Sequence, residues 1–147
     1  MIDSIKKLRE QTGLSVLDIK NALEAAAGDE EKAMDILISR GHEIAEKKSA
    51  RTAKEGVVES YIHSNRKVGA IIVLHCETDF VAKSPEFREL AHNLAMQVAS
   101  MKPKTVDELL EQVFIKDQSL TIKQLLEKYI AKLGENIKVG DLSYFSV

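Results

Sequence analysis

The chain has 147 residues, which is enough for one domain or two small ones, and 30% of them are charged. Its formal net charge of −2 provides no global basic field, so we expect no direct nucleic-acid partner. A single cysteine excludes an intramolecular disulfide and a multi-cysteine zinc site. The N-terminus lacks the apolar stretch of a signal peptide, and no apolar run is long enough to span a bilayer. These features predict a cytoplasmic protein without a membrane partner.

Residues 1–41 have the pattern of three short helices. Apolar residues recur at helical spacing, Ser15 and Asp29 are suitable N-caps, and Gly13 and Gly41 are suitable stops. The pattern predicts a small three-helix bundle like the ubiquitin-associated module.

Residues 42–56 contain few large apolar side chains and are rich in Lys, Ala and Glu, so they are predicted to form a linker that is helical in its first half. The segment carries four basic residues, Lys47, Lys48, Arg51 and Lys54. They could touch phosphate, but no aromatic residues separate them and nearby Glu residues balance their charge. A solvated connector is the better interpretation.

Residues 57–147 combine strand and helix patterns. The expected elements are strands at Val57–Ile62 and Val68–Cys76, a helix from Pro85 to about Met101, helices capped by Thr105 and Thr121, and a strand at Ile137–Phe145. The chain is therefore predicted to be an α+β protein: the N-terminal bundle, the linker, then an antiparallel sheet with helices packed on one face.

The second strand is apolar at four consecutive positions, Ile71–Leu74, whereas a sheet with one wet face should alternate. This pattern predicts that both faces of the strand are covered. The helices cover one face. The N-terminal bundle, a partner protein or a second copy of the chain would cover the other.

The corner between this strand and the next helix, Cys76–Pro85, is the most informative segment. Ser84 is a good N-cap and Pro85 fits the first helical position, so the corner is short and held at both ends. Phe80 has two interpretations there. It either folds into the core, as most phenylalanines do, or it is an anchor for a pocket on a partner.

Catalytic and metal-binding motifs are missing from the sequence. There is no Walker-type loop, no GxSxG and no HExxH, and the four histidines lack metal-ligand spacing. Glu77 and Asp79 could act as paired carboxylates, but no nucleophile accompanies them. Cys76 is most simply a small buried hydrophobe. We therefore expect a protein that is not an enzyme and that has no cofactor and no metal site.

Five motifs occur together in one order: Leu8–Gly13, Leu17–Leu23, Gly28–Asp29, Cys76–Ala82 and Leu133–Ile137. The Thr-Asp-Phe-Val-Ala block at 78–82 is the most specific of them. This set resembles the bacterial elongation factor Ts family over most of the chain. The resemblance implies a translation elongation factor that acts as a guanine-nucleotide exchange factor. Its partner would be elongation factor Tu, in the GDP-bound and nucleotide-free states, from which it would displace Mg²⁺ and release GDP.

The resemblance also implies which residues contact that partner. Phe80 is the expected wedge, Asp79 should hold its approach, and Thr78 and Val81 should fix the corner. The secondary contacts that carry over are Arg9, Val16, Leu17, Lys20, His63, Leu133 and Gly134. For Leu133, a core position at a helix end is an equally good interpretation.

The sequence also departs from the family pattern. Long members carry two copies of the α+β unit, whereas this chain has room for one. Pro103–Leu109 nearly closes a gap that holds a charged helical segment in other members, and Gly140–Phe145 replaces a basic-aromatic strand. Short members resemble dimers whose sheets join, so a second copy of the chain is a further candidate partner.

Two other functions stay open from the sequence. The three-helix module alone suggests a ubiquitin-associated-type adaptor, although Thr12-Gly13-Leu14 is a poor version of the binding loop. The apolar second strand alone suggests an oligomerisation module without exchange activity.

Overall fold

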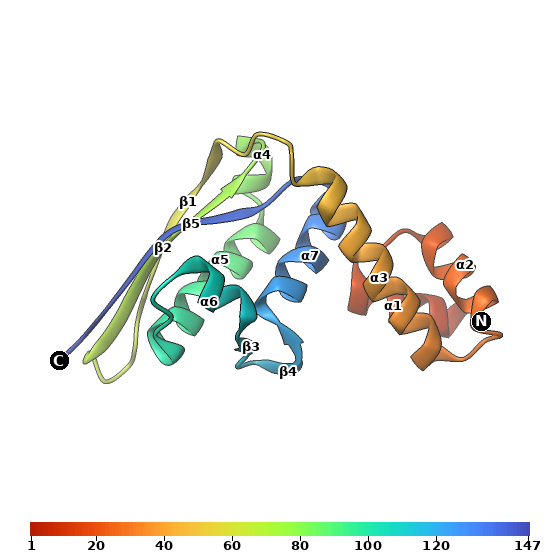
Figure 1. Cartoon of the computed structure of the whole chain (residues 1–147), viewed down its shortest axis with the longest axis horizontal. Coiled ribbons are helices and arrows are strands. Elements are labelled where there is room, and N and C mark those ends of the chain that lie inside the picture. The colour runs from red at the N-terminus through yellow and green to blue at the C-terminus, as the bar shows by residue number, and fades with distance from the viewer.

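Three helices form the N-terminal part of the computed structural model, which describes residues 1–147 (Figure 1). They are α1 (Ile2–Thr12), α2 (Val16–Ala25) and α3 (Glu30–Lys48). Their ends follow the predicted caps. Gly13 ends α1 in the left-handed conformation, and the side chains of Ser15 and Asp29 accept backbone N–H groups at the starts of α2 and α3. A cluster of eight buried residues, from Leu8 to Leu37, packs between these helices.

The prediction that Gly41 ends the third helix is wrong. α3 continues through this glycine to Lys48, and only residues 49–54 separate it from the first strand. A helical glycine costs only about 1 kcal/mol relative to alanine, and the following Glu-Ile-Ala-Glu-Lys-Lys run contains good helix formers. The irregular part of the linker is therefore shorter than the predicted residues 42–56.

The sheet contains β1 (Glu55–Ile62), β2 (Val68–Cys76) and β5 (Lys138–Ser146), with β2 in the centre and both pairings antiparallel. The predicted hairpin is present, and Val57 lies opposite Leu74 in its register. The pairing of β2 with β5 shifts between Ile72 and Leu74, so a bulge interrupts this ladder.

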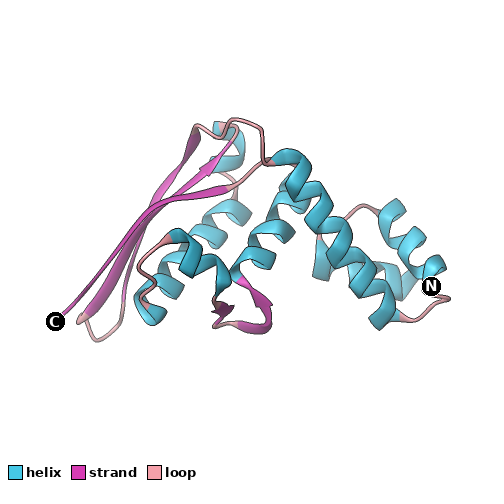
Figure 2. Cartoon of the chain, in the orientation of Figure 1, coloured by secondary structure: helices cyan, strands magenta, loops and turns pink.

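Helices cover one face of this sheet (Figure 2), as the α+β prediction required. They are α5 (Pro85–Met101) and α6 (Val106–Glu111), preceded by the one-turn helix α4 (Asp79–Ala82), and α7 (Ile122–Leu133) packs beside α6. Ser84, Thr105 and Thr121 are the N-caps of α5, α6 and α7, as predicted. A cluster of 21 buried residues, including Ile72, Leu74 and Phe87, forms the core between the sheet and the helices.

The opposite face of the sheet is open. Val58, Ile62, Ile71 and Phe145 are exposed there, and the N-terminal helices lie on the far side of α7 from the sheet (Figure 1). Of the three predicted covers for this face, the N-terminal bundle is therefore excluded, and a partner protein or a second copy of the chain stays a prediction. The apolar run reflects a buried face and an exposed apolar face.

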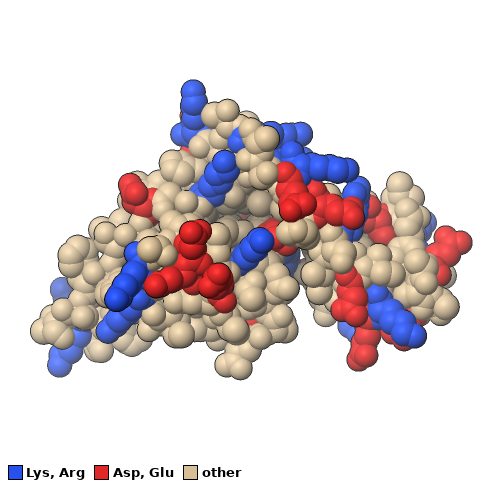
Figure 3. Space-filling model, in the orientation of Figure 1, with Lys and Arg blue, Asp and Glu red and all other residues tan.

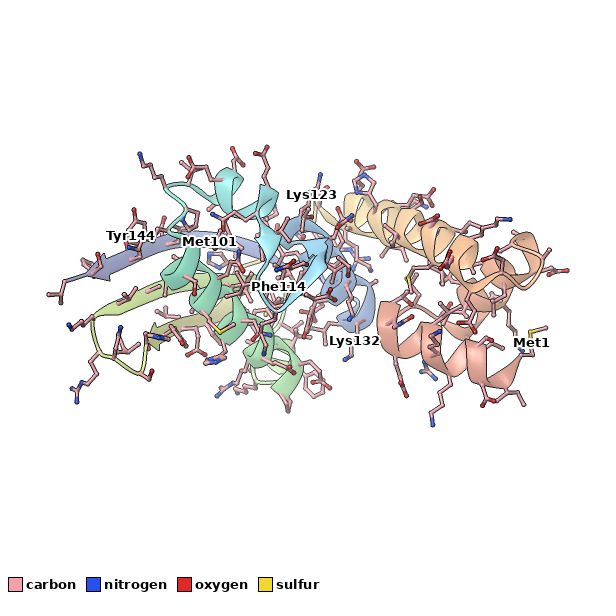
Figure 4. The ribbon with its side chains drawn as sticks, turned by 90° about the horizontal axis from the view of Figure 1, so that it is seen from below. Met1, Met101, Phe114, Lys123, Lys132 and Tyr144 are labelled. Atoms are coloured by element: carbon pink, nitrogen blue, oxygen red, sulfur yellow. The ribbon has the colours of Figure 1, made fainter.

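A small hairpin was not predicted. β3 (Val113–Phe114) and β4 (Asp117–Thr121) are joined through Ile115 and Lys116, which are not turn-forming residues. The buried side chain of Gln97 holds the hairpin, because its amide nitrogen donates to the carbonyl oxygen of Val113 at 3.0 Å and its oxygen accepts from Ile115 N at 3.0 Å. Phe114 lies beside α7 in Figure 4, and it is buried in the core.

The N-terminal helices contact the rest of the chain through α7. Lys132 lies on the side of α7 that these helices approach (Figure 4), and a Cβ atom added at Gly13 would lie 2.7 Å from Lys132 Cβ. Further along, His42 Nδ1 on α3 lies 2.8 Å from Glu127 Oε1 on α7. Ala131 packs against the N-terminal hydrophobic cluster.

Candidate partner-binding site

Phe80 is the most exposed aromatic residue of the chain, with 83% of its surface accessible. It lies in α4, the single helical turn between the end of β2 and the start of α5. The structure therefore excludes the core interpretation of this residue. Exposing a phenylalanine on a short, defined turn is typical of a binding anchor.

The turn around Phe80 is anchored on both sides. Val81 and Ala82 are buried in the main core, and Ser84 accepts the Phe87 N–H to begin α5. On the other side, the Thr78 hydroxyl oxygen accepts the N–H of Val81 at 3.3 Å. Thr78 and Val81 therefore have the geometry of residues that fix the corner. Because Val81 is 6% exposed, it supports the surface from below and does not form part of it.

Asp79 is exposed beside Phe80, and its only ion pair is with Lys83, at 3.5 Å on the same turn. This exposed i,i+4 pair contributes little to stability. The carboxylate of Asp79 is therefore available to a positively charged or hydrogen-bond-donating group on a partner.

Glu77 is not solvated, although it lies next to this surface. Its side chain is 18% exposed, and Oε2 accepts the backbone N–H of Asn136 at 3.3 Å and lies 3.6 Å from Arg51 Nη1. Glu77 is therefore part of the internal support of the corner. The interpretation of Glu77 and Asp79 as a carboxylate pair gains no support from these contacts.

Glu135 and Asn136 complete this support, and sequence reasoning missed their contacts. Glu135 Oε1 accepts the N–H groups of Glu77 and Thr78, both at 3.0 Å, and Oε2 accepts the hydroxyl of Thr78 at 2.7 Å. The Asn136 side chain donates to the carbonyl of Arg51 at 2.8 Å. The one signal in the sequence was their place in the Leu133–Ile137 motif, directly after the helix-ending Gly134.

Cys76 ends β2 below this corner and has no features of a reactive thiol. It is fully buried, and burial raises the pKa of its thiol to about 11. Its sulfur donates to the carbonyl oxygen of Thr78 at 3.1 Å. Cys76 is therefore a small core residue, as the sequence predicted.

The predicted contacts in the N-terminal helices lie on a separate surface. Leu17 is 68% exposed, Val16 is more than one-third exposed, and Arg9 and Lys20 are exposed. The neighbouring Asp18 is held by the Ser15 hydroxyl and by Arg40, and both lower its pKa. The result is an exposed apolar pair at the start of α2, with the exposed Lys20 about one turn further along the same helix.

His63 does not lie with Phe80. It follows β1 at the hairpin turn, whereas α4 follows the other end of β2, and nine extended residues span about 30 Å. The exposed His63 ring lies 3.0 Å from the Tyr61 hydroxyl.

Leu133 and Gly134 occupy the end of α7. Leu133 packs against the core, which favours the core interpretation of that residue, and Gly134 ends the helix with φ +75°. Leu133 is therefore a helix-end core residue with only partial exposure.

The surface charge is mixed. On the face in Figure 3, acidic and basic side chains are interspersed and neither sign forms a continuous field. No group of three or more His, Cys, Asp or Glu side chains is arranged to hold a metal ion. None of the helices combines the length and the apolar character needed to cross a membrane.

Known proteins resemble the chain over nearly all of its length. The family model described as "Elongation factor TS" matches residues 77–147, which begin at the corner. A protein of Thermotoga petrophila named elongation factor Ts is 39% identical over 189 aligned positions, covering 99% of this chain and 95% of its own. A protein of the same name from Pseudothermotoga lettingae is 51% identical over 146 positions, covering 97% and 74%.

The 189 aligned positions exceed the 147 residues of the chain, so the Thermotoga relative contains residues that this chain lacks. The prediction of a shortened chain agrees with this difference. With this identity over almost the full length of both proteins, the chain belongs to the elongation factor Ts family and is a translation elongation factor.

Proposed function

We propose that this protein is a guanine-nucleotide exchange factor for elongation factor Tu, and that it promotes GDP release by displacing Mg²⁺. The observation that carries the proposal is the exposure of Phe80 on a turn whose neighbours are buried or hydrogen-bonded. A residue that acts as a wedge needs an apolar side chain that is accessible to the partner and a backbone that is held rigidly in place. The Phe80 turn has both properties.

The thermodynamic basis is reciprocity between two ligands of one partner. A protein that binds the nucleotide-free partner more tightly than the GDP-bound partner must weaken GDP binding by the same factor. GDP is held through Mg²⁺ and through loop N–H groups at the phosphates. Movement of one element beside that site is therefore enough to lose the ion and then the nucleotide.

In this proposal, Phe80 enters a pocket of elongation factor Tu and Asp79 binds a polar group at its rim. Thr78 and Val81 hold the turn while the partner is deformed, through the hydroxyl contact and the buried side chain. No chemical bond changes on this protein during exchange, so no catalytic residue, cofactor or metal is required.

Residues 1–41 act as the docking module in the same proposal, and the end of α3 with the irregular residues 49–54 joins them to the α+β domain at 57–147. The exposed pair Val16 and Leu17 would bind an apolar groove, with Arg9 and Lys20 at its edge. His63 and Gly134 are secondary contacts of the α+β domain. Leu133 would contribute from its partly buried position at the end of α7.

Elongation factor Tu loaded with a fluorescent GDP analogue tests the proposal directly. Excess unlabelled GDP is added, and the decay of fluorescence is followed with and without this protein. We expect substoichiometric protein to accelerate release. An unchanged rate at saturating concentrations would overturn the proposal.

The alternative of an oligomerisation module without exchange activity is favoured by the open sheet face, where Ile71 and Phe145 are exposed. A second copy of the chain is the expected occupant. Sedimentation equilibrium would detect it, and the GDP-release assay decides whether exchange activity is present as well. The adaptor alternative loses support, because Leu14 of the Thr12-Gly13-Leu14 loop is 3% exposed and cannot be presented to a ligand.

A further inference from the structure

The position of Phe80 is determined by its backbone, because its own side chain packs against almost nothing. The last paired residues of the β1–β2 ladder are Glu55 and Cys76. Glu77 and Thr78 therefore lie beyond the sheet and before the helical turn, where their N–H groups have no ladder partner.

Glu135 supplies the missing acceptor. One oxygen, Oε1, accepts both N–H groups at 3.0 Å, so a single carboxylate holds the two residues that lead into α4. Hydrogen bonds to an ionised acceptor are stronger than those between neutral groups.

The second oxygen of Glu135 controls the cap of the turn. Oε2 accepts the Thr78 hydroxyl proton at 2.7 Å, which commits that proton and leaves an oxygen lone pair for the N–H of Val81. The hydroxyl orientation that caps α4 is thus selected from a distant part of the sequence. Without the carboxylate, the hydroxyl could rotate away from Val81.

The carboxylate is itself held in place. Gly134 ends α7 in the left-handed conformation directly before it, and Asn136 after it is 2% exposed, with its side chain bonded to Arg51 O. Asn136 also donates its own N–H to Glu77 Oε2. The ends of α7 and β2 and the segment after α3 meet at this point, at the upper edge of the molecule in Figure 1.

We propose that Glu135 is a positioning residue for the Asp79–Phe80 turn, and that it sets the geometry with which Phe80 meets the partner. This inference rests on the proposed exchange function for its activity test, but not for its structural test. Nothing in it requires Glu135 to touch elongation factor Tu.

A double-variant cycle in the GDP-release assay tests the proposal. We expect Glu135→Ala to slow stimulated release about tenfold, since small misplacements of a working group have large effects on rate. In the Phe80→Ala background, the same change should cost at most about twofold, because coupled residues are not additive. Glu135→Gln keeps one acceptor oxygen and should recover part of the loss. Glu89→Gln on α5, an exposed residue without a hydrogen bond from its side chain, is the charge-matched control.

Equal losses from Glu135→Ala in both backgrounds would overturn the proposal, and so would full activity of Glu135→Ala. If Glu135→Ala does not fold, Glu135→Gln is carried through the same cycle and judged in the same way.

Amide hydrogen exchange of the free protein, measured by NMR, does not depend on the exchange function. In Glu135→Gln, the amides of Glu77, Thr78 and Val81 should exchange faster than in the wild type, while those in the middle of α5 should not change. If the wild type fails to accelerate GDP release, the proposed function is wrong and this measurement alone decides the role of Glu135. Unchanged protection at those three amides would overturn it.

Discussion

Phe80 and Val81 are consecutive residues of α4, yet Phe80 is 83% exposed and Val81 is 6% exposed. Within this single helical turn, the side chain of Phe80 therefore faces solvent and the next side chain, Val81, anchors the turn in the core. Alanine variants at the two positions can be compared directly, because each one removes apolar atoms from the same turn.

We expect Phe80→Ala to change the free energy of unfolding by less than about 0.5 kcal/mol, because few contacts are lost. Stimulated GDP release should fall sharply in the same variant. Val81→Ala should instead cost about 2 kcal/mol of stability through lost burial. Urea titration and the GDP-release assay measure the two effects. A large stability loss in Phe80→Ala with full activity per folded molecule would contradict the wedge.

Asp79→Asn should slow GDP release while leaving the fold intact, since it removes the charge and keeps the shape of an exposed side chain. If Mg²⁺ displacement is the mechanism, raising free Mg²⁺ should also weaken binding of this protein to elongation factor Tu by mass action. Rates of GDP release, measured at increasing concentrations of free Mg²⁺ for the wild type and for Asp79→Asn, test both expectations.

Glu89→Gln is the control for general negative charge in that series. Equal losses in Asp79→Asn and Glu89→Gln would show that a diffuse charge effect operates. Glu77→Gln would not be a suitable control, because Glu77 is bonded to Asn136 and Arg51. If binding of this protein to elongation factor Tu does not depend on the Mg²⁺ concentration, ion displacement is not the mechanism, and only association of the two proteins remains.

Local signals in the sequence were sufficient for most of the fold. The cap residues Ser15, Asp29, Ser84 and Thr121 each accept an N–H at the predicted helix start, because capping depends on residues three positions away or fewer. The β1–β2 hairpin and the order of later elements follow from similarly local patterns.

Features that depend on distant residues could not be predicted. The β3–β4 hairpin lacks turn-forming residues and relies on Gln97, which is 18 residues from Ile115. The Glu135 carboxylate lies 57 residues from Thr78, and only the folded chain brings them together. The exposure of Phe80 could not be predicted either, because most phenylalanine residues lie in the core.

Removing residues 1–41 should weaken association with elongation factor Tu and leave residues 57–147 folded. Two hydrophobic clusters support this expectation: the eight buried residues of the first all lie within residues 1–41, and all the buried residues of the second except Ala45 lie within 57–147. Circular dichroism of the truncated chain and titration against elongation factor Tu measure the two effects. Collapse of the remaining domain would show that the contacts on α7 are essential to its fold.

Gly41→Ala should stabilise the protein by about 0.5–1 kcal/mol, because alanine restricts the unfolded chain and, apart from its chain neighbours and the backbone of its own helix, no atom lies within 4 Å of the added Cβ. Gly13→Ala is the matched comparison and should destabilise. Its φ is +69° and the added Cβ would lie 2.7 Å from Lys132 Cβ. Thermal unfolding of both variants tests whether α3 is continuous through residue 41. Destabilisation by Gly41→Ala would contradict a regular helix there.

The contact between His42 and Glu127 should make stability depend on pH. Glu127 accepts from the His42 ring at 2.8 Å and raises the pKa of His42 above its usual value of about 6.5. Desolvation of the ring opposes this shift, Glu46 adds a smaller increase, and Lys123 a smaller decrease. Because the folded-state pKa is the higher one, protonated His42 stabilises the fold. This contribution is complete below pH about 6.5 and is lost as the pH rises through the folded-state value.

An NMR titration of the His42 ring should therefore give a midpoint above the usual histidine value of about 6.5. Glu127→Gln should return the His42 midpoint toward the ordinary value, because it removes the charge and keeps the length of the side chain. In parallel, the difference in unfolding free energy between the wild type and His42→Asn should shrink as the pH is raised. A His42 midpoint that does not respond to Glu127→Gln would mean that the two side chains are not coupled, and that α3 and α7 are held together by apolar packing alone.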